Sequence, residues 1–102
     1  MNFFSLLFGK SPYPAGSKPE VDRLIGELIR IGKGEDFLSE RSGGSFDQTC
    51  RHKRAREIGQ RMNDLGGLTL MEYVRDRVKK QLGETLSTHL EYAWDEIGVW
   101  VP

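Results

Sequence analysis

Cysteine is nearly absent from this sequence of 102 residues, because Cys50 is the only one. A single cysteine excludes an intramolecular disulfide, so we expect a fold that rests on its apolar core, in a reducing, cytoplasmic compartment. Long apolar runs are also absent, and no stretch approaches the roughly 20 residues that a membrane-spanning helix needs. The apolar start of the chain lacks a basic beginning and a small-residue cleavage site, which argues against a secretory signal.

The chain has no net charge, because 15 Lys and Arg residues balance 15 Asp and Glu residues. The balance hides a local asymmetry. Residues 48–83 carry nine basic and four acidic side chains, whereas residues 84–102 carry four acidic side chains and no Lys or Arg. A basic middle and an acidic end can neutralise each other within the fold, or they can form two faces of opposite sign.

The length suits one domain, and the composition, with 37% hydrophobic and 29% charged residues, is typical of a folded globular protein. Residues 1–17 form an apolar N-terminal segment followed by a linker rich in proline, glycine and serine. Residues 18–102 carry helical signals almost throughout, and no convincing strand is present. We therefore predict a helical domain over residues 18–102.

Capping residues and glycines mark the expected ends of the helices. The start of the third helix has two agreeing signals, because Thr69 and Glu72 have capping-box spacing while Leu68 and Tyr73 occupy hydrophobic-staple positions. The four expected helices run from Ser17 to Gly32 and Gly34, from Ser45 or Asp47 to Leu65, from Thr69 to Gly83, and from about Thr85 to Ile97.

Short glycine connections between the last three helices favour antiparallel neighbours. The predicted class is all-α, with four helices arranged as two antiparallel hairpins or as an irregular bundle. The hairpin layout resembles a short piece of an α-solenoid of the HEAT or armadillo type in architecture alone, and no motif carries a function across. The residues expected in the core lie at helical spacing: Val21, Leu24, Ile25, Leu28, Ile31, Ala55, Ile58, Met62, Leu65, Met71, Val74, Val78, Leu82, Leu86, Leu90, Ala93, Trp94 and Ile97. The apolar tail around Trp100 is expected to fold back on this core.

The long connection from Lys33 to Phe46 ends in a glycine-rich loop that enters a basic helix. Gly43 and Gly44 let a backbone approach a ligand, and a helix N-terminus with nearby cations favours an anion. The sequence matches no phosphate-loop fingerprint, so this anion- or nucleic-acid-binding module is the alternative hypothesis. Its cations would be Arg51, Lys53, Arg54 and Arg56, with Arg61 further along the helix.

Cys50 lies near the start of the same basic helix, where amide groups and cations favour a thiolate. A reactive thiol, in a small enzyme or redox sensor, is therefore the third hypothesis. The structural alternative is a small apolar residue under the helix start, and it is favoured because no base or resolving partner is visible.

Metal-binding and catalytic patterns are weak in this sequence. Cys50, His52 and His89 lack clustered zinc spacing, so we predict no metal and no cofactor. Glu91 and Asp95 lie one helical turn apart and could share a face, although a solvated acidic face is far more common than an acid–base pair. No catalytic residue is predicted.

The N-terminal segment holds several large apolar side chains: Phe3, Phe4, Leu7 and Phe8, with Leu6 between them. Such a segment packs on its own domain, docks in a second subunit or lies on a membrane surface. It lacks the basic face of an interfacial anchor, so packing or self-association is favoured. The leading hypothesis is a non-enzymatic helical protein-interaction domain, an adaptor or a self-associating protein.

Overall fold

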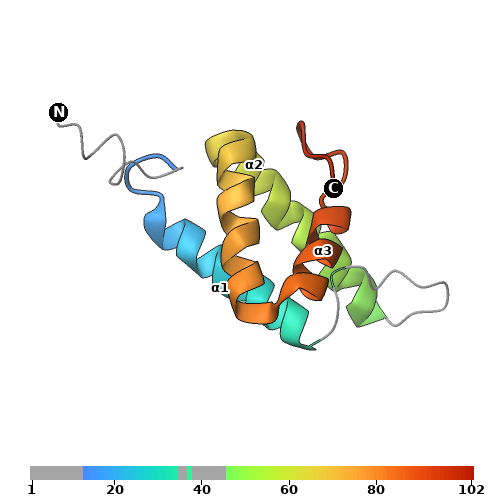
Figure 1. The fold of residues 1–102 in the computed structure, drawn as a ribbon. Coiled ribbons are helices and arrows are strands. Elements are labelled where there is room, and N and C mark those ends of the chain that lie inside the picture. Colours follow the sequence, from blue (N-terminus) through green and yellow to red (C-terminus); the bar gives the residue numbers. More distant parts are fainter. Residues whose placement is uncertain (1–12, 35–36, 38–45) are drawn as a thin grey trace.

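A computed structural model describes residues 13–34, Phe37 and residues 46–102, with side chains from residue 51 onward in the last stretch. Three helices form the described part: α1 (Lys18–Gly34), α2 (Phe46–Leu82) and α3 (Glu84–Ala93), as Figure 1 shows. No strand occurs among these residues, so the predicted all-α class is confirmed. None of the helices in the described ranges is long and apolar enough to cross a membrane.

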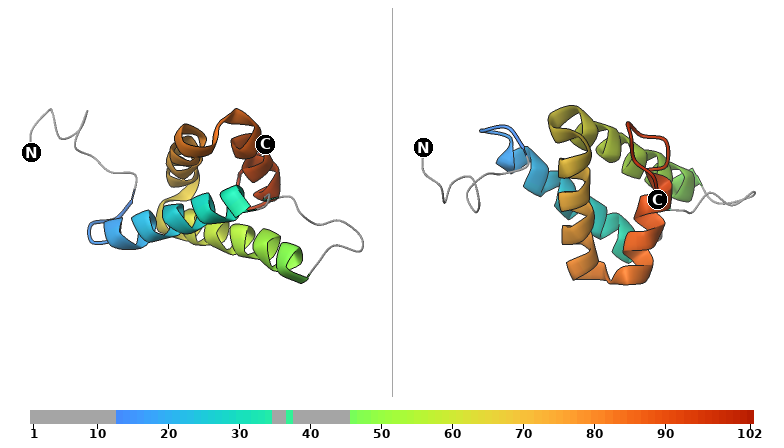
Figure 2. Two further views of the ribbon diagram at one scale, coloured as in Figure 1. Left: turned by 90° about the horizontal axis from the view of Figure 1, so that it is seen from below. Right: turned by 45° about the horizontal axis from the view of Figure 1, so that its top comes forward.

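Gly67 breaks α2 into two arms. Its backbone angles, φ 67° and ψ −155°, are not helical, and glycine tolerates this positive φ because it has no Cβ atom. The chain turns back sharply at this point (Figures 1 and 2). We call residues 46–66 the first arm and residues 68–82 the second arm.

The structure has three helices in the described part rather than the predicted four, because the second and third expected helices meet at this break without a loop. Leu68 and Thr69 are already helical, so the second arm begins just before the predicted Thr69 cap. A single glycine with positive φ reverses the chain without a connecting loop, so the two arms follow each other directly from Phe46 to Leu82.

Helix α1 begins where the sequence predicts. The carbonyl oxygen of Ser17 accepts the first helical hydrogen bond from the amide of Val21 at 2.9 Å, so Ser17 holds the cap position. The start of the helix follows a turn in which the Ser17 amide donates to the Pro14 carbonyl. Just before that turn, Tyr13 packs edge-on against Tyr73 of the second arm, with ring centroids 6.0 Å apart.

The core lies where α1 and α3 each pack against α2. The expected apolar positions are confirmed, although Ile31, Leu65, Leu82 and Leu86 are only partly buried. The buried apolar side chains are Val21, Leu24, Ile25, Leu28, Phe37, Ala55, Ile58, Met62, Leu70, Met71, Val74, Val78, Leu90, Ala93, Trp94, Ile97 and Trp100.

Phe37 ties the connection between α1 and α2 to this core. Its side chain is fully buried, and its carbonyl oxygen lies 2.7 Å from Nδ1 of His52. A Cβ atom on Gly32 would lie only 2.9 Å from the Phe37 ring, so α1 and this ring are in close contact. Leu38 and the Phe46 side chain lie outside the described residues.

Trp94 is the centre of the contact between α3 and the first arm. Its indole Nε1 donates a hydrogen bond of 2.9 Å to the carbonyl oxygen of Ala55. One turn further along, a Cβ atom on Gly59 would lie 2.5 Å from the same nitrogen. The ring therefore occupies a site that exists only because residue 59 has no side chain.

Helix α3 ends earlier than predicted, at Ala93 rather than Ile97. The amide of Asp95 donates to the carbonyl of Tyr92, and that of Ile97 to the carbonyl of Trp94, which are three-residue turns. Glu96 and Gly98 then have positive φ, at 70° and 56°, which takes the chain out of the helix.

Candidate interaction surface

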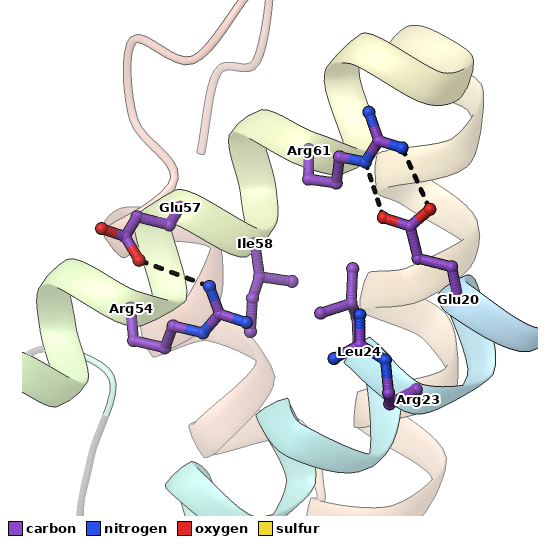
Figure 3. Close-up of a pocket in the computed structure, with 7 residues that line it drawn as sticks. All are labelled: Glu20, Arg23, Leu24, Arg54, Glu57, Ile58 and Arg61. Carbon is purple, nitrogen blue, oxygen red and sulfur yellow. Dashed lines mark hydrogen bonds and ion pairs between the residues drawn. The ribbon is translucent and has the colours of Figure 1, made fainter.

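A hollow of about 270 Å³ lies between α1 and the first arm of α2 (Figure 3). Leu24 and Ile58 form its apolar floor. Its remaining lining side chains are charged and include both signs: Glu20, Arg23, Arg54, Glu57 and Arg61.

Two bidentate ion pairs cross from one helix to the other beside this hollow. Arg54 donates from Nε and Nη2 to the carboxylate of Glu27, at 2.5 and 3.0 Å. Arg61 donates in the same way to Glu20, at 2.6 and 3.0 Å. We call these two pairs the ion-pair seam. Forked pairs of this kind fix geometry as well as adding energy.

The seam also sets the protonation of its carboxylates. The hydrogen bond from Arg54 holds the pKa of Glu27 below its ordinary value, and that from Arg61 does the same for Glu20. Both carboxylates are therefore ionised at neutral pH. The guanidinium groups of the seam are already engaged within the chain.

Sequence reasoning grouped Arg54 and Arg61 among the cations of an anion-binding helix, and it missed their partners. A signal was present, because Glu20 and Glu27 are seven residues apart, as are Arg54 and Arg61. Seven residues make two helical turns, so each pair of like charges lies on one stripe of its helix. Two matching stripes of opposite sign predict two facing helices.

The other predicted anion-binding residues are not brought together in the described part of the chain. Arg56 donates from Nη1 to the carbonyl oxygens of Ala93 and Asp95, at 2.7 and 2.9 Å, where α3 ends. Lys53 is exposed, and Arg51 is half-buried with an interaction partner of its own. Gly43 and Gly44 lie outside the described residues. The anion- or nucleic-acid-binding module stays a prediction, and the engagement of Arg54 and Arg56 does not favour it.

Several other predicted site residues lie outside the described part. These are the side chain of Cys50 and the N-terminal residues Phe3, Phe4, Leu7 and Phe8. Among the residues that are described, no three His, Cys, Asp or Glu side chains gather in a way that could hold a metal ion.

The tail, residues 94–102, is fastened to the fold through Trp100. The indole Nε1 of Trp100 donates to the carbonyl oxygen of Glu91 at 2.9 Å, and its ring packs edge-on against Trp94 with centroids 5.2 Å apart. The guanidinium of Arg75 lies 5.7 Å from the centre of the Trp100 ring and pairs with the Glu91 carboxylate at 3.3 Å. The predicted return of the tail is thus confirmed for Trp100, which is 4% exposed.

The neighbours of Trp100 have the opposite environment. Val99 is 71% exposed and Val101 is 81% exposed, and Tyr92, on the last turn of α3, is 57% exposed. Val99 and Val101 flank Trp100 in the chain, and Tyr92 follows Glu91, whose carbonyl oxygen accepts the hydrogen bond from Trp100. We call Tyr92, Val99 and Val101 the apolar patch.

Two carboxylates lie in the turns between α3 and Val99, and we call them the acidic border of the apolar patch. Asp95 and Glu96 are both exposed, and within the described ranges neither side chain forms an ion pair. Glu91 pairs with Arg75, so it does not form a two-carboxylate site with Asp95. Glu96 also has a φ of 70°, which is the only positive φ of a non-glycine residue in the described part.

Comparison with known proteins gives no relative for this chain. No family model matches it, and neither a curated protein nor a solved structure matches it. The functional argument therefore depends on the geometry above.

Proposed function

We propose that this chain is a small helical protein-interaction domain and that the apolar patch on its tail contacts the partner. One observation carries the proposal: two valines are held at 71% and 81% exposure on either side of a buried tryptophan. Single exposed apolar side chains are ordinary on protein surfaces, but a group of them on one anchored point marks an interaction site.

The anchoring of Trp100 makes this surface suitable for binding. A tail that is fixed before the partner arrives loses little conformational entropy on association. Aromatic and aliphatic side chains within a polar surround also have the anatomy of a protein interface. The apolar N-terminal residues would add a second contact, which is a prediction from their composition alone.

Co-purification from the source cells tests the proposal. The full chain, its Val99→Ser/Val101→Ser variant and a matched control are used as baits, and the bound proteins are identified by mass spectrometry. The control is Leu68→Ser, because Leu68 is an exposed apolar side chain (38%) at the break in α2 and is not part of the tail. We expect a partner that binds the native chain and the control but not the double variant.

Direct binding with the purified partner and sedimentation of the chain alone complete the test. Loss of the partner with both variants, or with neither, contradicts a role for the patch. Self-association that depends on the two valines identifies a second copy of the chain as the partner. Deletion of residues 1–10 is expected to change the oligomeric state or the melting temperature.

A further inference from the structure

The acidic border of the apolar patch indicates the chemistry of its partner. We propose that the patch binds a basic amphipathic segment of another protein, with apolar side chains on Val99 and Val101 and Lys or Arg side chains beside Asp95 and Glu96. This inference rests on the interaction function proposed above and adds the charge and shape of the partner.

The carboxylates of Asp95 and Glu96 have no arginine partner among the described residues, unlike several acidic groups elsewhere in the fold. Glu20, Glu27 and Glu91 each pair with a guanidinium inside the fold. The side chains of Asp95 and Glu96 form no such pair within the described residues, and they lie in the turns that join α3 to Val99. They are therefore available to a cation from outside.

Two arginines that contact the end of α3 and the tail are already engaged. Arg56 donates to the carbonyl oxygens of Ala93 and Asp95, and Arg75 binds Glu91 and the face of the Trp100 ring. Residues 81–102 contain no Lys or Arg. Counting both arginines, the charged groups around the patch keep an excess of negative charge, which favours a cationic partner surface.

The same border argues against phosphate-bearing partners at this site. A nucleic acid or an anionic lipid surface would bring further negative charge against Asp95 and Glu96, and like charges disfavour the contact. The apolar side chains need an apolar counterpart, because burying them against polar groups would leave those groups unsatisfied. A segment with one apolar and one basic face satisfies both requirements.

Three synthetic peptides test the inference with the full-length chain. The three peptides share the same Leu and Phe positions. All their remaining positions are Lys in the first peptide, Gln in the second and Glu in the third. Binding is measured by fluorescence anisotropy of labelled peptide, and the site is located by the NMR shifts of the Val99 and Val101 methyl groups. We expect the Lys peptide to bind most tightly, and we expect added salt to remove most of its advantage.

Charge-neutralised variants show which groups cause the preference. Asp95→Asn/Glu96→Gln is expected to weaken binding of the Lys peptide by about three- to tenfold at low salt, since exposed ion pairs contribute modestly. Its binding of the Gln peptide should not change. The matched control is Glu84→Gln, because Glu84 is an exposed carboxylate at the opposite end of α3.

The outcomes separate this inference from the proposed function. Equal binding of the Lys, Gln and Glu peptides at the valines overturns the charge preference and leaves the apolar patch as a binding surface. Failure of every peptide to bind overturns the inference, while co-purification still judges the proposed function. Low-salt self-association that is lost in Asp95→Asn/Glu96→Gln also overturns it, because the occupant is then a second copy.

Discussion

The ion-pair seam and the tail show two ways of using polar groups on one small fold. Along the seam, two carboxylates of α1 meet two guanidinium groups of α2 in forked hydrogen bonds. On the tail, one tryptophan is bonded to the fold while Val99, Val101 and two carboxylates face solvent. The charged groups of the seam are paired within the chain, whereas the valines and carboxylates of the tail are exposed and can contact another molecule.

This difference separates structure from function. Arginines on a helix surface are a common reason to suspect a nucleic-acid or anion site, and the sequence here raises that hypothesis. The seam gives those guanidinium groups a structural role, because opposite charges on α1 and α2 fix how the helices are aligned. Groups that the fold does not use are the better guide to a partner, and the tail carries exposed apolar and acidic side chains of this kind.

The largest expected effect comes from filling the site under Trp94. In Gly59→Ala the new Cβ atom would lie 2.5 Å from the Trp94 indole nitrogen, so the ring must move and its hydrogen bond to Ala55 is lost. We expect the free energy of unfolding to fall by about 2 kcal/mol, because overpacking outweighs the gain in helix propensity. Urea unfolding followed by tryptophan fluorescence measures it.

Gly26→Ala is the matched control for this change. A Cβ atom at residue 26 would lie 3.7 Å from a guanidinium nitrogen of Arg30, which is ordinary contact. The same substitution should then stabilise the protein by about 0.5–1 kcal/mol through helix propensity. Equal effects at the two glycines would show that Trp94 does not depend on close approach to α2.

Acid pH tests the seam. The pKa of Glu27 is lowered in the folded protein, so its contribution to stability is present above the ordinary pKa of 4.5 and is lost as the pH falls through the lower, folded value. In Glu27→Gln we expect the free energy of unfolding at neutral pH to fall by about 1 kcal/mol, the upper range for a partly exposed pair. Unfolding midpoints measured from neutral to acid pH should converge for the native and variant proteins.

Glu57→Gln is the control on the same arginine. Glu57 makes one contact with Arg54, at 3.4 Å, and its side chain is 50% exposed. We therefore expect a much smaller loss of stability at every pH. If the two variants lose equal stability, or if Glu27→Gln keeps the acid sensitivity of the native chain, the seam does not stabilise the fold as described.

Periodicity predicted the core well and helix ends less well. Apolar spacing identified the buried faces of α1 and both arms of α2, because burial of one stripe repeats along a whole helix. The Thr69 capping box misplaced a boundary, since Gly67 reverses the chain one residue before the helix resumes. Trp94 and Ile97 continue the apolar spacing of α3, but they lie in the turns that follow the helix. Spacing alone does not distinguish a buried residue in a helix from a buried residue in such a turn.

The candidate site was harder to predict, because the sequence does not show which side chains from different helices lie opposite each other. Sequence gives the face of one helix but not the helix that covers it, so Arg54 was assigned to an anion site rather than to a pair with Glu27. In the same way, an apolar Val-Trp-Val run predicts a buried tail. The structure buries Trp100 and leaves both valines exposed, because only the tryptophan reaches Trp94 and Arg75.

The smallest expected effect on stability sharpens the comparison most, because it separates folding from binding at one residue. Glu96 has φ 70°, a conformation that glycine adopts with less strain than glutamate. In Glu96→Gly we expect the free energy of unfolding to rise by about 0.5 kcal/mol, since relief of strain exceeds the added flexibility of the unfolded chain. Binding of the Lys peptide should weaken in the same variant, since one border carboxylate is lost.

Glu96→Asn, which also tolerates positive φ, distinguishes loss of charge from loss of rigidity. A variant that is more stable and binds as well as the native chain would show that the Glu96 carboxylate does not contribute to binding.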